Sequence, residues 1–186
     1  MFKSSFPTIK TDELILRKVK PEDIVFFNAL SSPETSKYEF WQPHRTFEDT
    51  QRFLETIFQR YAEGKYFDWT IERKEDGEQV GMISFHDIYP LHARADLGFW
   101  IVRRFRNKGY ATKAAKALIE YGFSKLGLER IQSLCAVENE PSIHVLEKIG
   151  MKREALLEKY VRLNVDKTKL SDVYMYTIFP EVKNGI

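Results

Sequence analysis

The sequence predicts one α/β domain in which helices flank a mixed, partly antiparallel sheet. Extended runs and helical segments alternate along the chain, in the order strands, helix, strand, helix, strands. Asp76 and Gly77 stand between two extended runs, a pattern typical of a hairpin and therefore of antiparallel strands. Small and apolar residues recur at spacings of three and four between Tyr110 and Leu126, so a helix there has one face to bury.

Turn and capping residues set the predicted bounds of the elements. Thr46 and Asp49 form a capping signal before the second helix, and Gly64 and Gly127 are suited to the ends of helices. The predicted strands cover residues 14–17, 66–73, 79–86, 96–102 and 130–137, and the predicted helices cover residues 21–30, about 46–62, 110–126 and 141–149. Two further strands are expected within 151–179, joined by a polar segment at 164–171.

The composition fits a single domain over residues 1–186, with its core at about 10–179. The chain has 186 residues, of which 43% are hydrophobic and 30% charged, which is enough apolar material to form a core. The net charge of +2 gives no electrostatic case for binding nucleic acid. Monomer and homodimer both remain open.

We expect a cytoplasmic protein that does not act in a membrane. No apolar run approaches the roughly 18–20 residues that a spanning helix needs, and residues 1–10 lack the pattern of a secretory signal. Cys135 is the sole cysteine, so no internal disulfide can form, which suits a reducing compartment. It lies in an apolar run and is expected to be an inert core residue.

The most informative stretch runs from Trp100 to Thr112, where a strand is followed by a basic loop, a glycine and the start of a helix. The first turn of a helix has unpaired N–H groups and a partial positive charge, which favour an anion such as a diphosphate. Gly109 permits a close approach or a positive φ, and Ala111 is small. The alternative interpretation is that Gly109 only shapes a turn and that the basic residues form a solvated face.

Arg106-x-x-Gly109-x-Ala111 resembles the [QR]-x-x-G-x-[GA] signature of the GNAT superfamily of N-acetyltransferases, which also lies between a strand and a helix. Other segments resemble the ribosomal-protein (RimJ/RimL-like) branch of that superfamily: residues 11–17, 95–100, 109–112 with 122–123, and 139–151. The resemblance covers about residues 10–179 in the same order. It implies the GNAT fold, with a mostly antiparallel, splayed central sheet between helices.

The resemblance implies acetyl-coenzyme A as cosubstrate and no metal. In the family, the pantetheine arm lies between two splayed strands and the diphosphate lies on the loop that follows. Residues Phe99–Val102 would then run along the arm, and the backbone groups of Ile101 and Val102 would bind its amides. The residues expected to contact the cofactor are Trp100, Ile101, Val102, Arg103, Arg106, Asn107, Lys108, Gly109, Tyr110, Ala111, Thr112, Asn139 and Ser142. For Asn139 and Ser142 the alternative is a structural role at the start of a helix.

The implied reaction is attack of a neutral amine on a thioester, in a ternary complex. It needs a base for the amine and a proton donor for the leaving thiolate. Asp96 is the first candidate for the base, and His86 with Asp87 or Glu158 are alternatives. Ser142 is the first candidate for the proton donor and Tyr160 the second.

The acceptor is expected to be a primary amine, either the N-terminal α-amine of a protein or a small amine such as a polyamine or an aminosugar. Glu39 and Trp41 are expected to cradle a cationic amine by charge and cation–π contacts, with His86 also near it. Core packing of the aromatic residues is an equally good interpretation of that segment. A coenzyme-A-binding module without turnover is the alternative from another functional class.

Overall fold

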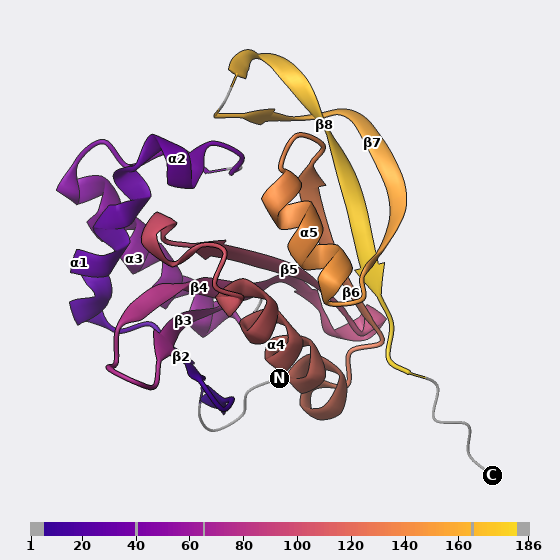
Figure 1. The fold of residues 1–186 in the computed structure, drawn as a ribbon, viewed down its shortest axis with the longest axis horizontal. Coiled ribbons are helices and arrows are strands. Elements are labelled where there is room, and N and C mark those ends of the chain that lie inside the picture. Colours follow the sequence, from indigo (N-terminus) through magenta and orange to yellow (C-terminus); the bar gives the residue numbers. More distant parts are fainter. Residues whose placement is uncertain (1–5, 40, 65, 165, 182–186) are drawn as a thin grey trace.

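The computed structural model describes residues 6–39, 41–64, 66–164 and 166–181, and it has eight strands in one sheet with helices on both faces (Figure 1). The strands are β1 (Ile9–Lys10), β2 (Leu14–Lys18), β3 (Phe67–Arg73), β4 (Gln79–Tyr89), β5 (Arg94–Ile101), β6 (Arg130–Ala136), β7 (Lys152–Leu163) and β8 (Asp166–Ile178). The α-helices are α1 (Ile24–Phe27), α2 (Pro33–Ser36), α3 (Phe47–Glu63), α4 (Tyr110–Leu126) and α5 (Glu140–Lys148). Short 3₁₀ turns are η1 (Pro21–Asp23), η2 (Asn28–Ser31), η3 (Pro90–His92) and η4 (Arg103–Phe105).

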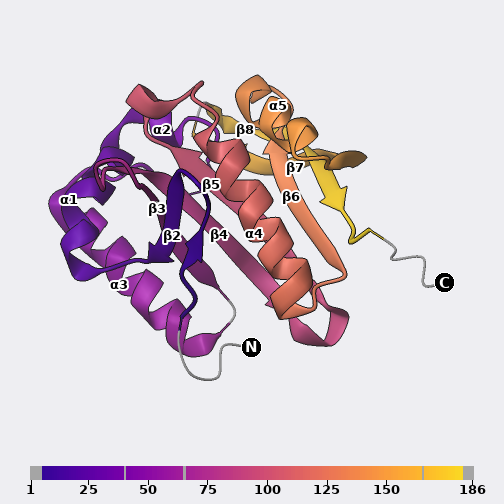
Figure 2. The same cartoon turned by 60° about the horizontal axis from the view of Figure 1, so that its bottom comes forward.

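The sheet has the strand order β1-β2-β3-β4-β5-β6-β8-β7, and α4 and α5 cover one of its faces while α1 and α3 cover the other (Figure 2). Among the described residues only the β5–β6 pairing is parallel, and the other neighbours are antiparallel. The expectation of a mixed, mostly antiparallel sheet between helices is therefore confirmed.

The two long helices begin and end where the local chemistry predicts. Thr46 and Asp49 form a capping box at the start of α3, and the Thr46 hydroxyl accepts a hydrogen bond from the Asp49 N–H at 3.2 Å. Gly64 follows that helix and Gly127 follows α4, both in the left-handed region at φ 71° and 66°. The residues 110–126 predicted for the fourth helix are those that α4 occupies.

The helix predicted at 21–30 is instead three short pieces, η1, α1 and η2, and a buried carboxylate accounts for its first turn. Asp23 accepts hydrogen bonds from the Arg17 guanidinium at 2.8 and 2.9 Å, from the Lys20 N–H at 2.9 Å and from the Thr70 hydroxyl at 3.1 Å. These partners pull the start of the segment towards β2 and β3 and tighten it into a 3₁₀ turn. The short helix α2 was not predicted.

The C-terminal hairpin also differs from the expected pattern. The polar segment predicted to join its strands is mostly part of β8, because pairing with β7 continues to Leu163 and Asp166. Residues 167–170 are exposed on β8. Their polar side chains are therefore explained by contact with solvent and do not indicate a loop. Val165, in the expected linker, lies outside the described residues. No helix in the described part of the chain is long and apolar enough to span a bilayer.

The contact between α4 and the sheet is tight at Gly122. A Cβ atom there would lie 2.9 Å from Phe85 Cζ and 3.1 Å from Ile131 Cδ1. Overpacking of this kind costs about 1–3 kcal/mol, so we expect Gly122→Val to lower the free energy of unfolding by that amount in urea titrations. Lys116→Val, on the exposed side of the same helix, is the matched control and should cost less than about 0.7 kcal/mol. Equal losses for the two variants would contradict the tight contact.

Candidate functional site

The central feature of the site is an opening between β5 and β6. The two strands pair only at residues 94–96 with 130–132, whereas β5 stays paired with β4 as far as Ile101. Beyond Asp96, β5 therefore leaves β6, and one side of β5 faces a gap instead of a strand. Backbone N–H and C=O groups on that side need other partners.

Alternation along β5 determines which backbone groups face the opening. The Val102 N–H donates to the Val80 carbonyl on the β4 side at 3.0 Å. In an antiparallel ladder, alternate residues point to opposite sides, so Phe99 and Ile101 direct their N–H and C=O groups towards β6. The expected binding of an extended ligand by the Val102 N–H is thus corrected: Phe99 and Ile101 are the residues with backbone groups on the correct side.

The side chain of Trp100 does not line the opening either. Its ring stacks on Phe26 at 5.3 Å between centroids and lies edge-on to Phe27 at 6.0 Å, both from α1. The Trp100 side chain, which the sequence analysis placed at the cofactor, therefore packs against α1 instead. The Trp100 Nε1 group is buried without a hydrogen-bond partner among the described residues.

The loop between η4 and α4 points backbone N–H groups outwards. Asn107 and Gly109 both have left-handed backbones, at φ 61° and 80°, and no side chain caps the first turn of α4. Alternating backbone handedness of this kind forms a concave nest of N–H groups, and the helix dipole adds positive potential. The N–H groups of Tyr110, Ala111 and Thr112 lie in that first turn and suit a diphosphate. The Tyr110 side chain is buried, with its ring edge-on to that of Phe105, so it contributes through its backbone.

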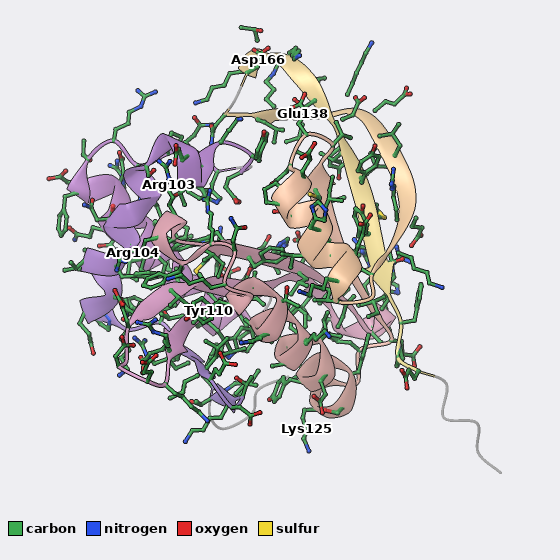
Figure 3. The ribbon with its side chains drawn as sticks, viewed as in Figure 1. Arg103, Arg104, Tyr110, Lys125, Glu138 and Asp166 are labelled. Carbon is green, nitrogen blue, oxygen red and sulfur yellow. The ribbon has the colours of Figure 1, made fainter. Side chains whose placement is uncertain are left out.

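Each basic side chain of the loop has a partner at the surface. Arg103 pairs with Glu34 of α2 and Arg104 with Glu78, both at 2.6 Å, and Lys108 lies 5.5 Å from the centre of the Phe105 ring. Figure 3 shows Arg103 and Arg104 beside the α1–α2 side of the molecule and Tyr110 at the start of α4. Exposed ion pairs are weak, so these cations can turn towards a bound phosphate.

Arg106 plays a different part from the other basic residues. Its Nε donates to the Ile101 carbonyl at 3.0 Å and its Nη2 to the Glu34 carbonyl at 3.4 Å. The side chain thus ties the loop to the end of β5 and to α2. The short-range signature contains Arg106, but this bracing contact depends on the fold and was not predicted.

The opposite side of the opening is formed by β6 and the start of α5. Asn139 caps this helix, because its side chain accepts a hydrogen bond from the Ser142 N–H at 3.4 Å. Ser142 is half-buried in the first turn, with its hydroxyl free of the cap. Cys135 Sγ lies 3.8 Å from the Asn139 carbonyl, and burial raises the pKa of its thiol to about 12. The thiol therefore stays protonated at neutral pH, as expected for an inert residue.

A polar cluster lies where the opening begins. His86 faces Asp96 across the β4–β5 pairing, and ligand atoms of His86, Asp87 and Asp96 lie within 4.8 Å of one another. Burial raises the pKa of Asp96, against the lowering effects of a hydrogen bond from Gln132 Nε2 and of the nearby His86. The other carboxylate oxygen of Asp96, Oδ1, is buried without a hydrogen-bond partner in the described part of the chain.

Gly98 makes room for this cluster. A Cβ atom at that position would lie 3.1 Å from His86 Nε2 and 3.2 Å from Ser84 Oγ. His86 also stacks on Tyr66, whose hydroxyl donates to Asp87 at 2.9 Å. The cluster therefore runs from the exposed Asp87 to the buried Asp96, a suitable arrangement for moving protons.

A second carboxyl group, Glu39, follows α2, whose Glu34 carbonyl Arg106 links to the end of β5. Burial raises its pKa to about 7, while a hydrogen bond from Trp41 Nε1 at 3.1 Å and the charge of Arg106 act in the opposite direction. Trp41 is partly buried, near the rings of His44 and Phe53, so it serves packing as well as holding Glu39.

Tyr160 and Glu158 are exposed on β7, on either side of Lys159, whose φ is 49°. This bulge lies between the paired residues Leu157 and Val161. Ser142 lies in the first turn of α5, whereas Tyr160 is exposed on β7 at the edge of the sheet.

Asn164 is a residue that sequence reasoning missed. From the turn between β7 and β8 it donates to the carbonyls of Ser36 at 2.9 Å and Trp41 at 2.7 Å. Nothing in the sequence links positions so far apart. The only signal was the polar character of the segment that starts at Asn164, which indicated no partner.

Comparisons with known proteins agree with this geometry. Residues 13–152 match the family model described as an acetyltransferase (GNAT) domain. The crystal structure of a GNAT-family acetyltransferase from Bacillus anthracis superposes with a TM-score of 0.81 at 31% identity, covering 93% of this chain and 98% of that one.

Two relatives carry more specific names. A spermidine N(1)-acetyltransferase from Escherichia coli (strain K12) is 29% identical over 143 residues, which are 76% of this chain and 74% of that protein. A candidate ribosomal N-acetyltransferase, YdaF of Bacillus subtilis (strain 168), is 42% identical over 79 residues, 42% of this chain and 43% of that protein. These names differ in the acceptor and agree in the reaction.

The left-handed conformation of Gly109 gives a test of the anion-binding loop. A Cβ atom there would have only Lys113 Cε within 4 Å, at 3.9 Å, so a substitution acts through the backbone and not through a clash. Gly109→Ala should weaken coenzyme A binding about 5- to 30-fold, because alanine disfavours this conformation by roughly 1–2 kcal/mol. Gly109→Asp should abolish binding by adding a negative charge.

Gly109→Asn is the matched control, because asparagine tolerates positive φ, and it should bind better than Gly109→Ala. Calorimetry measures all three affinities. Unchanged binding by Gly109→Asp would contradict the loop assignment.

Proposed function

The chain belongs to the GNAT acetyltransferase family, and from that premise we propose that it acetylates the N-terminal α-amine of a protein by direct attack in a ternary complex. It is an N-acetyltransferase that uses acetyl-coenzyme A. The observation that carries the proposal is the opening between β5 and β6, which runs from Asp96 to the N–H groups that begin α4.

The chain's own groups fit acetyl-coenzyme A along this opening. Backbone groups of Phe99 and Ile101 are oriented to bind the amides of the pantetheine arm, as an additional strand would. The turn from Asn107 to Thr112 offers N–H groups to the diphosphate, and the loop cations surround it. A backbone N–H of β5 can also polarise the thioester oxygen and stabilise the oxyanion that forms during attack.

An α-amine suits a site with a modest base. With a pKa of about 7.8, an α-amine costs roughly 1 kcal/mol to deprotonate at pH 7, whereas a lysine amine at about 10.4 costs roughly 4–5 kcal/mol. We assign this proton to Asp96, since burial raises the pKa of its carboxyl above the usual range and its Oδ1 lacks a partner in the described chain. His86 and Asp87 then lead the proton to solvent.

Collapse of the tetrahedral intermediate breaks the carbon–sulfur bond and leaves a thiolate. We assign its proton to the Ser142 hydroxyl, which acts as a relay from the second amine proton, because serine alone is a weak acid. The products are the acetylated amine, coenzyme A with a free thiol, and one proton released to solvent.

A small polyamine is the second candidate acceptor, and two observations favour it. The relative from Escherichia coli is named a spermidine acetyltransferase, and Glu39 with Trp41 offers a carboxylate and an indole to a cationic amine. Both acceptors present an ammonium group to the same opening.

An acceptor panel separates these possibilities. We expect thiol release from acetyl-coenzyme A to be faster with peptides that carry a free N-terminus than with spermidine or aminosugars, and N-terminal blocking of the peptides should abolish it. A higher kcat/KM for spermidine than for the peptides would identify a polyamine, and not a protein N-terminus, as the acceptor. Tight coenzyme A binding with no turnover on any amine would contradict the proposed transfer and favour a non-catalytic module.

Variants of Ser142 and Asp96 distinguish the proton donor from the base by their effects on kcat, on the Kd of coenzyme A and on the pH dependence of turnover. Ser142→Ala should lower kcat about 10²-fold or more without changing the Kd of coenzyme A. Asp96→Asn should instead remove the acidic limb of kcat measured at saturating acceptor, because a base is active only above its pKa and turnover falls as pH drops through it. Equal effects of Ser142→Ala on kcat and on cofactor binding would make Ser142 a binding residue only.

A further inference from the structure

The β7–β8 hairpin reaches across the molecule to the segment that follows α2. In Figure 1 the hairpin arches over α5, and its tip approaches the end of α2. Asn164, at that tip, donates one hydrogen bond to the Ser36 carbonyl and one to the Trp41 carbonyl. Lys167, on the same hairpin, donates to the Gln42 side chain. The side-chain amide of Asn164 thus joins the two ends of the segment that runs from Ser36 to Trp41.

Glu39 lies inside that stretch. Its N–H donates to the Ser36 carbonyl at 3.0 Å and its carboxylate accepts from Trp41 Nε1, so Glu39 is held through the same two residues that Asn164 binds. Loss of the Asn164 amide would therefore loosen both ends of the frame around Glu39 at once.

Hydrogen bonds place the segment that carries Glu39 at the mouth of the opening. Arg106 donates both to the Ile101 carbonyl, the last of β5, and to the Glu34 carbonyl of α2. Asn164 ties the other side of this segment to the β7–β8 hairpin, and β8 pairs with β6. Glu39 is therefore held between the β5 side and the β6–β8 side of the sheet.

We infer that Asn164 is a positioning residue for the acceptor, which holds Glu39 at the mouth of the β5–β6 opening so that its carboxylate binds the incoming ammonium group. The inference rests on the proposed transfer to an amine, and it applies equally to a peptide N-terminus and to a polyamine because the ammonium group is common to both. Proton removal stays with Asp96, and Glu39 contributes charge and orientation.

Elementary electrostatics favours Glu39 as the group that binds the ammonium ion. A partly buried carboxylate attracts a cation more strongly than an exposed one, because water screens it less. The neighbouring Trp41 indole adds a face for the same cation.

A double-mutant cycle in the 186-residue chain tests the inference. Asn164→Ala should raise the acceptor KM about tenfold, the equivalent of one or two lost hydrogen bonds, with kcat and the Kd of coenzyme A little changed. Glu39→Gln should raise KM at least as much. The double variant should be no worse than Glu39→Gln alone, because Asn164 acts through Glu39.

The pH profile adds a readout that simple destabilisation would not move. In the wild type, binding of the acceptor should weaken as pH falls through the pKa of Glu39, near 7, since the protonated carboxyl has no charge. Asn164→Ala exposes Glu39 to water, so its pKa falls and this limb moves to lower pH. Asp96, Arg106 and Cys135 face the same opening, and the limb must persist in Asp96→Asn to be assigned to Glu39.

Lys169→Ala is the matched control on the same hairpin, because Lys169 is exposed and pairs only with Asp166 at 3.9 Å in the described structure. It should leave KM and the pH profile unchanged. Asn164→Leu, which has a similar size and removes the donor without adding a charge, replaces Asn164→Ala if the latter does not fold.

The outcomes separate this inference from the proposed function. If the wild type acetylates no amine, the proposed transfer fails and the inference falls with it. If the wild type is active but the two substitutions are additive, or the acidic limb does not move, the transfer stands and the role of Asn164 is wrong.

Discussion

The short parallel pairing between β5 and β6 is the constraint on which the site depends. Three residue pairs hold the two halves of the sheet together, and beyond them β5 follows β4 while β6 follows β8. A longer pairing would satisfy the backbone groups of Phe99 and Ile101 within the sheet and leave nothing to recognise an extended ligand. The opening therefore exists because two antiparallel units of the sheet meet at one edge and then diverge.

Local chemistry made much of this fold predictable. The bounds of α4 and the capping box of α3 follow from residues within one turn of each helix end, and these signals do not depend on distant contacts. The segment at 21–30 failed as a single helix because Asp23 is committed to Arg17 and Thr70, which come from other strands. Helix propensity does not determine the local structure where a buried charge requires partners from other parts of the fold.

The site also has a part that local sequence predicts and a part that depends on distant contacts. Gly109 and the residues around it are contiguous, so the anion-binding turn could be inferred from the sequence. The residues of β5 that direct backbone groups towards the opening depend on its register with β4, which is why the sequence indicated Val102, whose N–H pairs with β4, and not Phe99. The contact from Asn164 to Ser36 joins opposite ends of the chain and has no local signal at all.

The state of Cys135 has a practical consequence. It is the chain's only sulfhydryl, it is 4% exposed, and it holds its proton well above neutral pH. Electrophilic dyes that report free thiols react with thiolates, so they should leave the folded protein unlabelled. Colour developed during turnover then counts released coenzyme A molecules alone, without a background from the catalyst itself.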